Sequence, residues 1–104
     1  MKLNEQGEKA EYFLNKYDWA RIEQQNGHSI LCGGILPKGE IKAGQKWISS
    51  GGLIVEVDKI ELFTNQIDLT YEEIHYSWDE PKGRKTHSKL AFSFQCRYCL
   101  ILEE

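Results

Sequence analysis

The chain lacks several features that would place it in a class of proteins at once. Its 104 residues carry a net charge of −3, and acidic and basic residues alternate without a block of either sign. Because a duplex-DNA-binding surface needs clustered lysine and arginine, the sequence argues against DNA binding. The acidity is also too mild for a protein that mimics DNA. No apolar run approaches the roughly 20 residues of a membrane-spanning helix, so we expect no contact with a membrane.

Cysteine is scarce, and the count is odd: the chain has Cys32, Cys96 and Cys99. The N-terminus has no apolar signal segment. Both features favour a reducing compartment over secretion, and we predict a cytoplasmic protein. Signatures of nucleotide-binding enzymes are missing too, since the two Gly-Gly pairs lack the spacing of phosphate-binding loops. No local signature of a catalytic serine or cysteine is present.

The N-terminal part predicts a helix followed by an ambiguous segment. From Met1 to Tyr17 the apolar residues Ala10, Phe13, Leu14 and Tyr17 recur at helical spacing. Residues 18–25 allow two interpretations. The helix can continue and end at Asn26-Gly27, or the same pair can form a two-residue hairpin turn between residues 19–24 and 28–32.

The remainder predicts antiparallel strands. Runs rich in β-branched and aromatic residues cover 28–36, 45–49, 53–63, 67–78 and 87–102, with turns or loops between them. The apolar alternation changes phase near Glu72-Glu73, which predicts a β-bulge there. Residues 79–86 predict a charged loop. Alternating apolar residues from Leu90 to Leu102 predict one long final strand.

These elements indicate an α+β fold in one domain, residues 1–104. Residues 1–43 form an N-terminal helix and hairpin extension, and residues 44–104 form a strongly curved antiparallel sheet or a small SH3-like β-barrel. The length suffices for one hydrophobic core without metal or disulfides.

Four residues have the types and spacings of a zinc site. His28 and Cys32 are separated by three residues, and Cys96 and Cys99 by two. However, residues three apart on a regular strand face opposite sides of a sheet, and buried cysteine is common in intracellular proteins. We therefore predict neither a bound metal nor another cofactor.

A second cluster contains titratable residues near one predicted hairpin: Glu72, Glu73, His75, His87 and Lys89. Two histidines beside a basic residue can cleave RNA by general acid–base catalysis. No spacing rule supports this assignment, so a small nuclease remains the second alternative function.

The favoured site is a binding surface without catalysis. Aromatic and basic residues flank the predicted charged loop, namely Tyr76, Trp78, Lys82, Arg84, Lys85 and His87. Such a surface suits stacking on a base or a peptide, or contact with an acidic partner. Arg97, on the polar side of the predicted final strand, is a further candidate for binding a carboxylate or phosphate. The plainer interpretation is a solvated hairpin tip with Trp78 in the core and Arg97 in a surface ion pair.

One pattern resembles a known class. The pattern begins with Gly44-Gln45-x-Trp47, Gly51-Gly52 and Val55-x-Val57-x-x-Ile60. It continues with Tyr71, Gly83-Arg84-Lys85-Thr86, Phe92 or Phe94, and Tyr98. Residues 44–104 thus resemble small barrel proteins of unassigned function that bacteriophages and mobile elements often encode. The resemblance brings no catalytic residues, but it implies an accessory role, such as the inhibition of a host or competitor system.

The sequence therefore predicts a non-enzymatic accessory protein that occupies a protein partner, such as a phage anti-defence inhibitor or an immunity protein. The first alternative is a protein that sequesters a small nucleotide signal through Trp78, Arg84 and Arg97. Self-association is also expected, because the edge strands of a small sheet need cover.

Overall fold

The first strands form a hairpin around Asn26-Gly27 in the computed structural model, which describes residues 21–33 and 35–102. Strand β1 (Arg21–Gln25) pairs with β2 (His28–Cys32). Both turn residues have positive φ, +54° and +80°, as a type I′ turn requires. The hairpin interpretation of this segment is therefore confirmed. The helix predicted over residues 1–17 lies outside the described residues.

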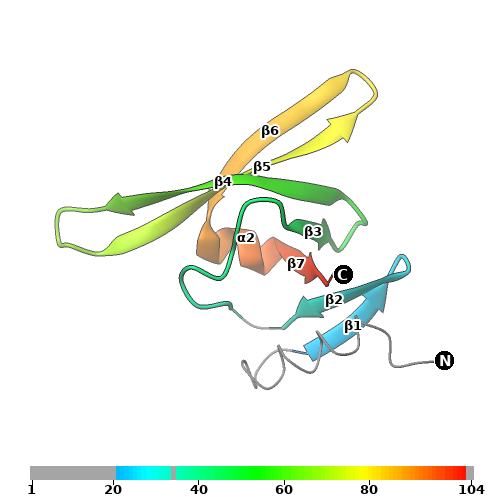
Figure 1. Ribbon diagram of the computed structural model, residues 1–104, viewed down its shortest axis with the longest axis horizontal. Coiled ribbons are helices and arrows are strands. Elements are labelled where there is room, and N and C mark those ends of the chain that lie inside the picture. The colour runs from blue at the N-terminus through cyan, green and yellow to red at the C-terminus, as the bar shows by residue number, and fades with distance from the viewer. Residues whose placement is uncertain (1–20, 34, 103–104) are drawn as a thin grey trace.

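Seven strands form one antiparallel sheet among the described residues (Figure 1). The order is β1-β2-β7-β3-β4-β5-β6, so the last strand of the chain lies between β2 and β3. The sheet curls into a half-barrel, with a short helix beside it, which confirms the curved sheet of an α+β fold. The remaining elements are β3 (Lys46–Ser49), β4 (Ile54–Thr64), β5 (Thr70–Glu80), β6 (Gly83–Leu90), α2 (Ala91–Arg97) and β7 (Tyr98–Ile101).

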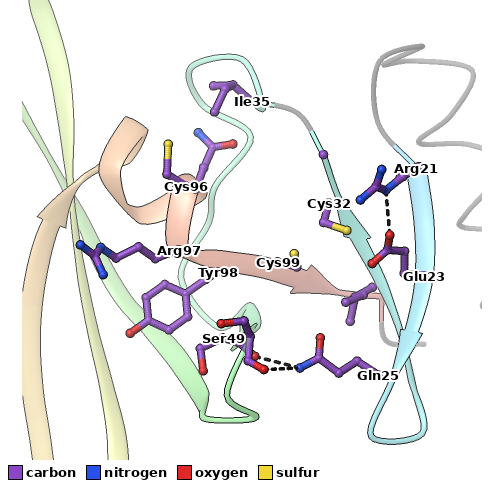
Figure 2. Close-up of a pocket in the computed structure, with 14 residues that line it drawn as sticks. Arg21, Glu23, Gln25, Cys32, Ile35, Ser49, Cys96, Arg97, Tyr98 and Cys99 are labelled. Carbon is purple, nitrogen blue, oxygen red and sulfur yellow. Dashed lines mark hydrogen bonds and ion pairs between the residues drawn. The ribbon is translucent and has the colours of Figure 1, made fainter.

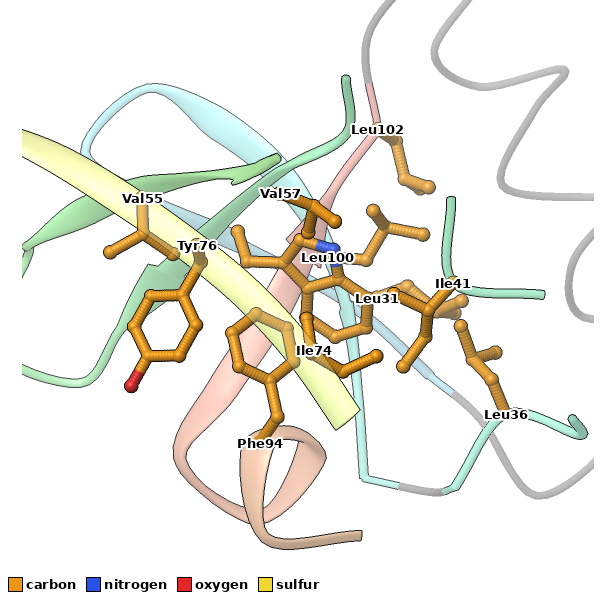
Figure 3. Packing of buried hydrophobic residues seen from close by; sticks show 11 residues of the cluster. Leu31, Leu36, Ile41, Val55, Val57, Ile74, Tyr76, Phe94, Leu100 and Leu102 are labelled. Carbon is orange, nitrogen blue, oxygen red and sulfur yellow. The ribbon is translucent and has the colours of Figure 1, made fainter. Parts of the chain in front are cut away.

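The hydrophobic core lies against the concave side of the curl, where α2 contributes Phe94 (Figure 3). Phe94 is fully buried and meets the Trp47 ring edge-on, with ring centroids 5.0 Å apart. Tyr76 is 1% exposed and lies 5.0 Å from the same phenyl ring. Ile30, Ile48 and Ile101 form a smaller hydrophobic cluster. Each is the chain neighbour of a core residue on its strand, so the three side chains lie on the opposite face of the sheet.

The prediction of one long strand over residues 87–102 was wrong. The chain forms β6 to Leu90, then α2, then β7. Its alternating apolar residues are not equivalent: Phe92 is 66% exposed, whereas Phe94 is buried. Ala91, Phe94 and Tyr98 pack against the core at intervals of three and four residues, the spacing of one helical face. A helix of seven residues gives too few repeats of that pattern to outweigh the alternation.

The position of the predicted β-bulge was also wrong. The register shift lies in β4, between Val57 and Lys59, whereas the pairing of β5 is continuous through Glu72 and Glu73. The apolar phase changes in β5 because the apolar residues up to Tyr71 are exposed, whereas Ile74 and Tyr76 are buried. Glu72 shares the core face with Ile74, and its carboxylate accepts the Gly39 amide hydrogen bond at 3.1 Å.

Two predicted loop boundaries also differ from the structure. The predicted strand from residue 67 begins only at Thr70, so residues 65–69 form the loop between β4 and β5. The predicted loop over residues 79–86 is instead a two-residue turn, Pro81-Lys82, because β5 and β6 extend on either side of it. The β5–β6 hairpin is consequently longer than the sequence indicated, whereas the β4–β5 hairpin has a longer loop.

The connector between β2 and β3 is fastened to the sheet. Leu36 and Ile41 are buried in the core. Gln45 accepts hydrogen bonds from the Lys42 amide (3.0 Å) and the Trp47 indole (3.2 Å). The glutamine of the Gly-Gln-x-Trp motif therefore joins the connector to the core tryptophan. No helix within the described ranges is long and apolar enough to cross a membrane.

Candidate functional site

Strand β5 carries a two-stranded ribbon at each of its ends, and the ribbons point in different directions (Figure 1). Toward its N-terminus β5 pairs with the end of β4, and residues 62–71 form what we call the apolar arm. Toward its C-terminus β5 pairs with β6, and residues 79–85 form the polar arm. The two arms contain most of the candidate binding surface.

The apolar arm exposes large hydrophobic side chains on both faces. The exposed fractions are 64% for Leu62, 41% for Phe63, 72% for Ile67, 56% for Leu69 and 38% for Tyr71. Apolar residues that lie singly on a surface are ordinary, but a contiguous group of this size is typical of an interaction surface. The sequence analysis placed these residues in predicted strands over residues 53–63 and 67–78 and did not single them out as exposed. The consecutive Leu62-Phe63 pair, which must face both sides of a strand, was the signal that could have identified the arm.

The tip of the apolar arm has a defined conformation. The Asn65 carboxamide oxygen accepts hydrogen bonds from the backbone amides of Ile67 and Leu69, each at 3.0 Å. The Asn65 amide donates to the Leu69 carbonyl, also at 3.0 Å, and Asp68 adopts φ +62°. The loop therefore holds the Ile67 and Leu69 side chains in solvent through its own hydrogen bonds.

Both edges of the apolar arm are open. The pairs between β3 and β4 end at Glu56, and the pairs between β5 and β6 end at Glu73. Beyond these points no third strand from residues 21–33 or 35–102 flanks the arm. An isolated two-stranded ribbon is marginal in water, and an uncovered edge can pair with another chain.

The predicted binding residues of β5 and β6 fall on two faces of the polar arm. Tyr76 pairs with His87 and Trp78 with Lys85, so these four side chains share one face. Arg84 pairs with Asp79 and lies on the other face. The structure therefore brings four of the predicted residues together at one surface.

Tyr76 occupies the core end of that shared face. Its ring packs on Trp78 (centroids 5.9 Å apart), His87 (5.8 Å) and Tyr98 (5.5 Å). Burial, together with a hydrogen bond to the Tyr98 side chain, raises the pKa of the Tyr76 hydroxyl well above its usual value. The phenol is therefore neutral at physiological pH, and a bound molecule would meet Trp78 and His87 before it met Tyr76.

Arg84 is held by three acceptors. Its guanidinium donates to Asp79 at 2.6 Å, to Glu56 at 3.1 Å and to the Ser77 hydroxyl at 3.1 Å. The hydrogen bond to Asp79 is the main reason that the pKa of Arg84 is raised. Ser77, which is fully buried, donates in turn to Asp58 at the β4 bulge, at 3.0 Å. Arg84 thus ties three strands together, and its donors are largely occupied.

Arg97 is separated from the polar arm. It ends α2 and borders a groove of about 810 Å³ together with Cys96, Tyr98 and Cys99 (Figure 2). Trp78 and Arg84 line a different hollow, of about 500 Å³, and His87 a third, of about 460 Å³. Arg97 forms no ion pair with any residue that the structure describes. The predicted binding residues therefore do not converge on one pocket.

The structure also separates the zinc ligands that the spacing suggested. Cys32, Cys96 and Cys99 line the same groove, but His28 lies at the other end of β2 and faces the hollow of Trp78. The only group of three ligands that converges in the described ranges is Glu61, Glu73 and His75, on the outer face of the β4–β5 ribbon. His75 Nε2 lies 2.5 Å from Glu61 and 3.7 Å from Glu73.

The titratable cluster proposed for RNA cleavage is divided as well. His75 pairs with Ser88 and His87 with Tyr76, so the histidines alternate between the faces of the β5–β6 ribbon. Glu72 is buried against the connector.

Comparisons with protein-family models, curated proteins and solved structures give no match for this chain.

Proposed function

We propose that this protein is a non-enzymatic binding module that docks on a protein partner through its apolar arm and acts by occupying the partner's surface. The observation that carries the proposal is the exposure of Leu62, Phe63, Ile67, Leu69 and Tyr71 on one projecting ribbon. Large apolar side chains at the centre of an interface supply most of its binding free energy. The mode of action is that of an inhibitor or immunity protein, with a host or competitor protein as the partner.

The geometry of the tip favours tight binding. Because Asn65 already holds the loop in shape, the arm loses little conformational entropy when a partner covers Ile67 and Leu69. The open edges of β4 and β5 offer backbone donors and acceptors beside the apolar side chains. A partner that contributes a strand would satisfy these groups and bury the side chains in the same step.

The charges around the arm define the partner's chemistry. Glu61 and Glu73 are directly paired at the base of the arm, and Asp68 lies at its tip. An apolar groove or open strand edge with a basic rim would complement this surface. A second copy of the chain fits less well, because a two-fold pairing of arms would bring the same acidic groups toward one another.

The alternative functions receive less support from the geometry. A nucleotide site would use Arg84, whose donors already bind Asp79, Glu56 and Ser77. A two-histidine nuclease would need both imidazoles on one substrate. His75 and His87 both border the hollow of about 460 Å³, but the register sets them on opposite faces of the ribbon, and His75 contacts Glu61.

The proposal is tested by placing a photo-crosslinking amino acid at Ile67 in the full chain and irradiating cells that produce it. The matched control carries the same group at Lys82, the tip of the polar arm. We expect a discrete protein adduct from position 67 that is competed by unlabelled wild-type protein but not by an Ile67→Asp, Leu69→Asp variant. Equal adducts from both positions, or no adduct from position 67, would overturn the proposal. An adduct with the mass of two copies would replace the heterologous partner by self-association.

A further inference from the structure

Three side chains from neighbouring strands form a row across the sheet. Arg21 on β1 lies directly opposite Cys32 on β2. The register between β2 and β7 pairs Ile30 with Ile101 and Leu31 with Leu100, and its next step sets Cys32 opposite Cys99. Figure 2 shows both sulfur atoms on the same side of the strands. Directly opposed residues in an antiparallel pair have Cα atoms about 4.5–5.5 Å apart, which falls within the span of a disulfide.

The two thiols have different surroundings. Cys99 packs against the small isoleucine cluster, and its burial, followed by a hydrogen bond with Cys32, raises the pKa of its thiol to about 12. Cys99 is therefore protonated at neutral pH. Cys32 lies opposite Arg21, whose guanidinium pairs with Glu23 at 2.8 Å. The pKa of Arg21 is raised first by Glu23 and next by a hydrogen bond to Cys32.

The pair is accessible from solvent. Cys32 and Cys99 are both partly exposed, and both border the groove of about 810 Å³ in which Arg21 also lies. Cys96, the third thiol of that groove, is exposed. The pair thus meets the two requirements of a redox-active dithiol, which are a short separation and a path for a reagent.

We propose that Cys32 and Cys99 are a redox site that closes to a disulfide by exchange with a small disulfide of the glutathione class. The Cys32 thiolate attacks one sulfur of the reagent, forms a mixed disulfide and releases one equivalent of thiolate. Cys99 then loses its proton and attacks the Cys32 sulfur, which releases the second thiolate. Both released thiolates take up the protons that the two cysteines gave up, so two protein thiols and one small disulfide become one protein disulfide and two small thiols.

This bond would join β2 to β7, the second and third strands in the sheet order, and would limit opening of the β1–β2 hairpin. It is independent of the apolar arm, which lies at another part of the sheet. Because a cross-link between residues far apart in sequence restricts the unfolded chain, we expect a higher melting temperature for the oxidised protein.

The test equilibrates the full chain in buffers of graded oxidised-to-reduced glutathione ratio. Intact mass should fall by two hydrogen atoms, and peptide mapping without reductant should recover a Cys32–Cys99 link. Cys96→Ser, the matched control, should keep the link, whereas Cys32→Ser and Cys99→Ser should lose it. Arg21→Gln, which removes the side chain that hydrogen-bonds Cys32, should slow its formation several-fold, and Arg21→Lys should restore much of the rate.

The mapping of the wild-type protein decides the matter even if a variant fails to fold. A Cys96–Cys99 link, a stable glutathione adduct confined to Cys96, or no oxidation under conditions that oxidise small dithiols would each overturn the proposal. An unchanged rate of link formation in Arg21→Gln would remove Arg21 from the site.

Discussion

The two arms extend from opposite ends of the same strand, β5, and have the same two-stranded construction, but their surfaces are opposite in character. The polar arm contains Asp79, Glu80, Lys82, Arg84 and Lys85, together with a proline at its turn. Charged residues and proline are the usual protection of an open strand edge against unwanted pairing. Asp68 is the one charged residue among residues 62–71. We infer that the polar arm is complete in water, whereas the apolar arm is completed by a partner.

The largest expected effect breaks this contrast directly. The Ile67→Asp, Leu69→Asp variant should weaken partner binding by about 100-fold or more, because buried apolar anchors dominate interface energies. Its stability should change little, since the two side chains are 72% and 56% exposed. Calorimetric titration with the captured partner measures the affinity.

The matched change in the polar arm is Lys82→Ala with Lys85→Ala, which should alter the affinity by no more than about threefold, as rim charges do. This control also tests the sequence-predicted surface, to which Lys85 belongs. Equal losses from the two arms would remove the distinction between them.

The next effect concerns the root of the polar arm. Ser77→Ala should destabilise the fold by about 1–2 kcal/mol, because it leaves Arg84 and Asp58 without their shared buried hydroxyl. Thr86, the exposed cross-strand neighbour of Ser77, is the control, and Thr86→Ala should cost less than about 0.5 kcal/mol. Urea unfolding of both variants measures the difference. Similar losses of stability in the two variants would show that the hydrogen bonds of Ser77 with Arg84 and Asp58 do not stabilise the fold.

A smaller effect sharpens the description of the apolar tip. Asn65→Ala removes the acceptor of two backbone amides and should cost about 1 kcal/mol of local stability. Affinity for the partner should fall only a few-fold, because the apolar side chains remain. Faster amide exchange at Ile67 and Leu69 is the direct readout, with Gln66→Ala as the control. Unchanged exchange would mean that the side chain does not order the tip.

The smallest expected effect near neutral pH is that of the protonation of Cys99 and Tyr76 on the free energy of unfolding. This effect becomes larger under alkaline conditions. The pKa of Cys99 is raised from 9.0 to about 12, and that of Tyr76 is raised from 10.0. The folded chain thus retains protons that the unfolded chain releases, so stability is complete below about pH 9 and declines as pH rises above it. Unfolding curves between neutral and alkaline pH measure the slope, which Tyr76→Phe and Cys99→Ser should each reduce. A flat profile would contradict the burial of both groups.

Local patterns predicted the elements whose determinants are local. The strand over residues 53–63 follows from alternation, and the Asn26-Gly27 turn was one of the two interpretations that turn chemistry allowed. The structure contains both. The helix α2 was missed because alternating Phe92 and Phe94 mimic a strand over so short a segment. Register alone placed Tyr76, Trp78, Lys85 and His87 on one face, which the sequence anticipated only as proximity to a loop.

Local pattern signals the apolar arm only in part, because the Leu62-Phe63 pair indicates exposure on one face of a strand but not the extent of the exposed surface. Whether Ile67 or Leu69 is buried depends on which strands flank β4 and β5, and that depends on the insertion of β7 between β2 and β3. Likewise, the opposition of Cys32 and Cys99 arises from pairing between strands far apart in the chain. Composition and spacing contain neither fact.

Hydrogen–deuterium exchange of the partner complex tests the central claim most directly, because it reports on both arms in one experiment. We predict slower exchange over residues 62–71 in the complex than in the free protein, and no change over residues 79–85. Protection of the polar arm with an unprotected apolar arm would contradict the account.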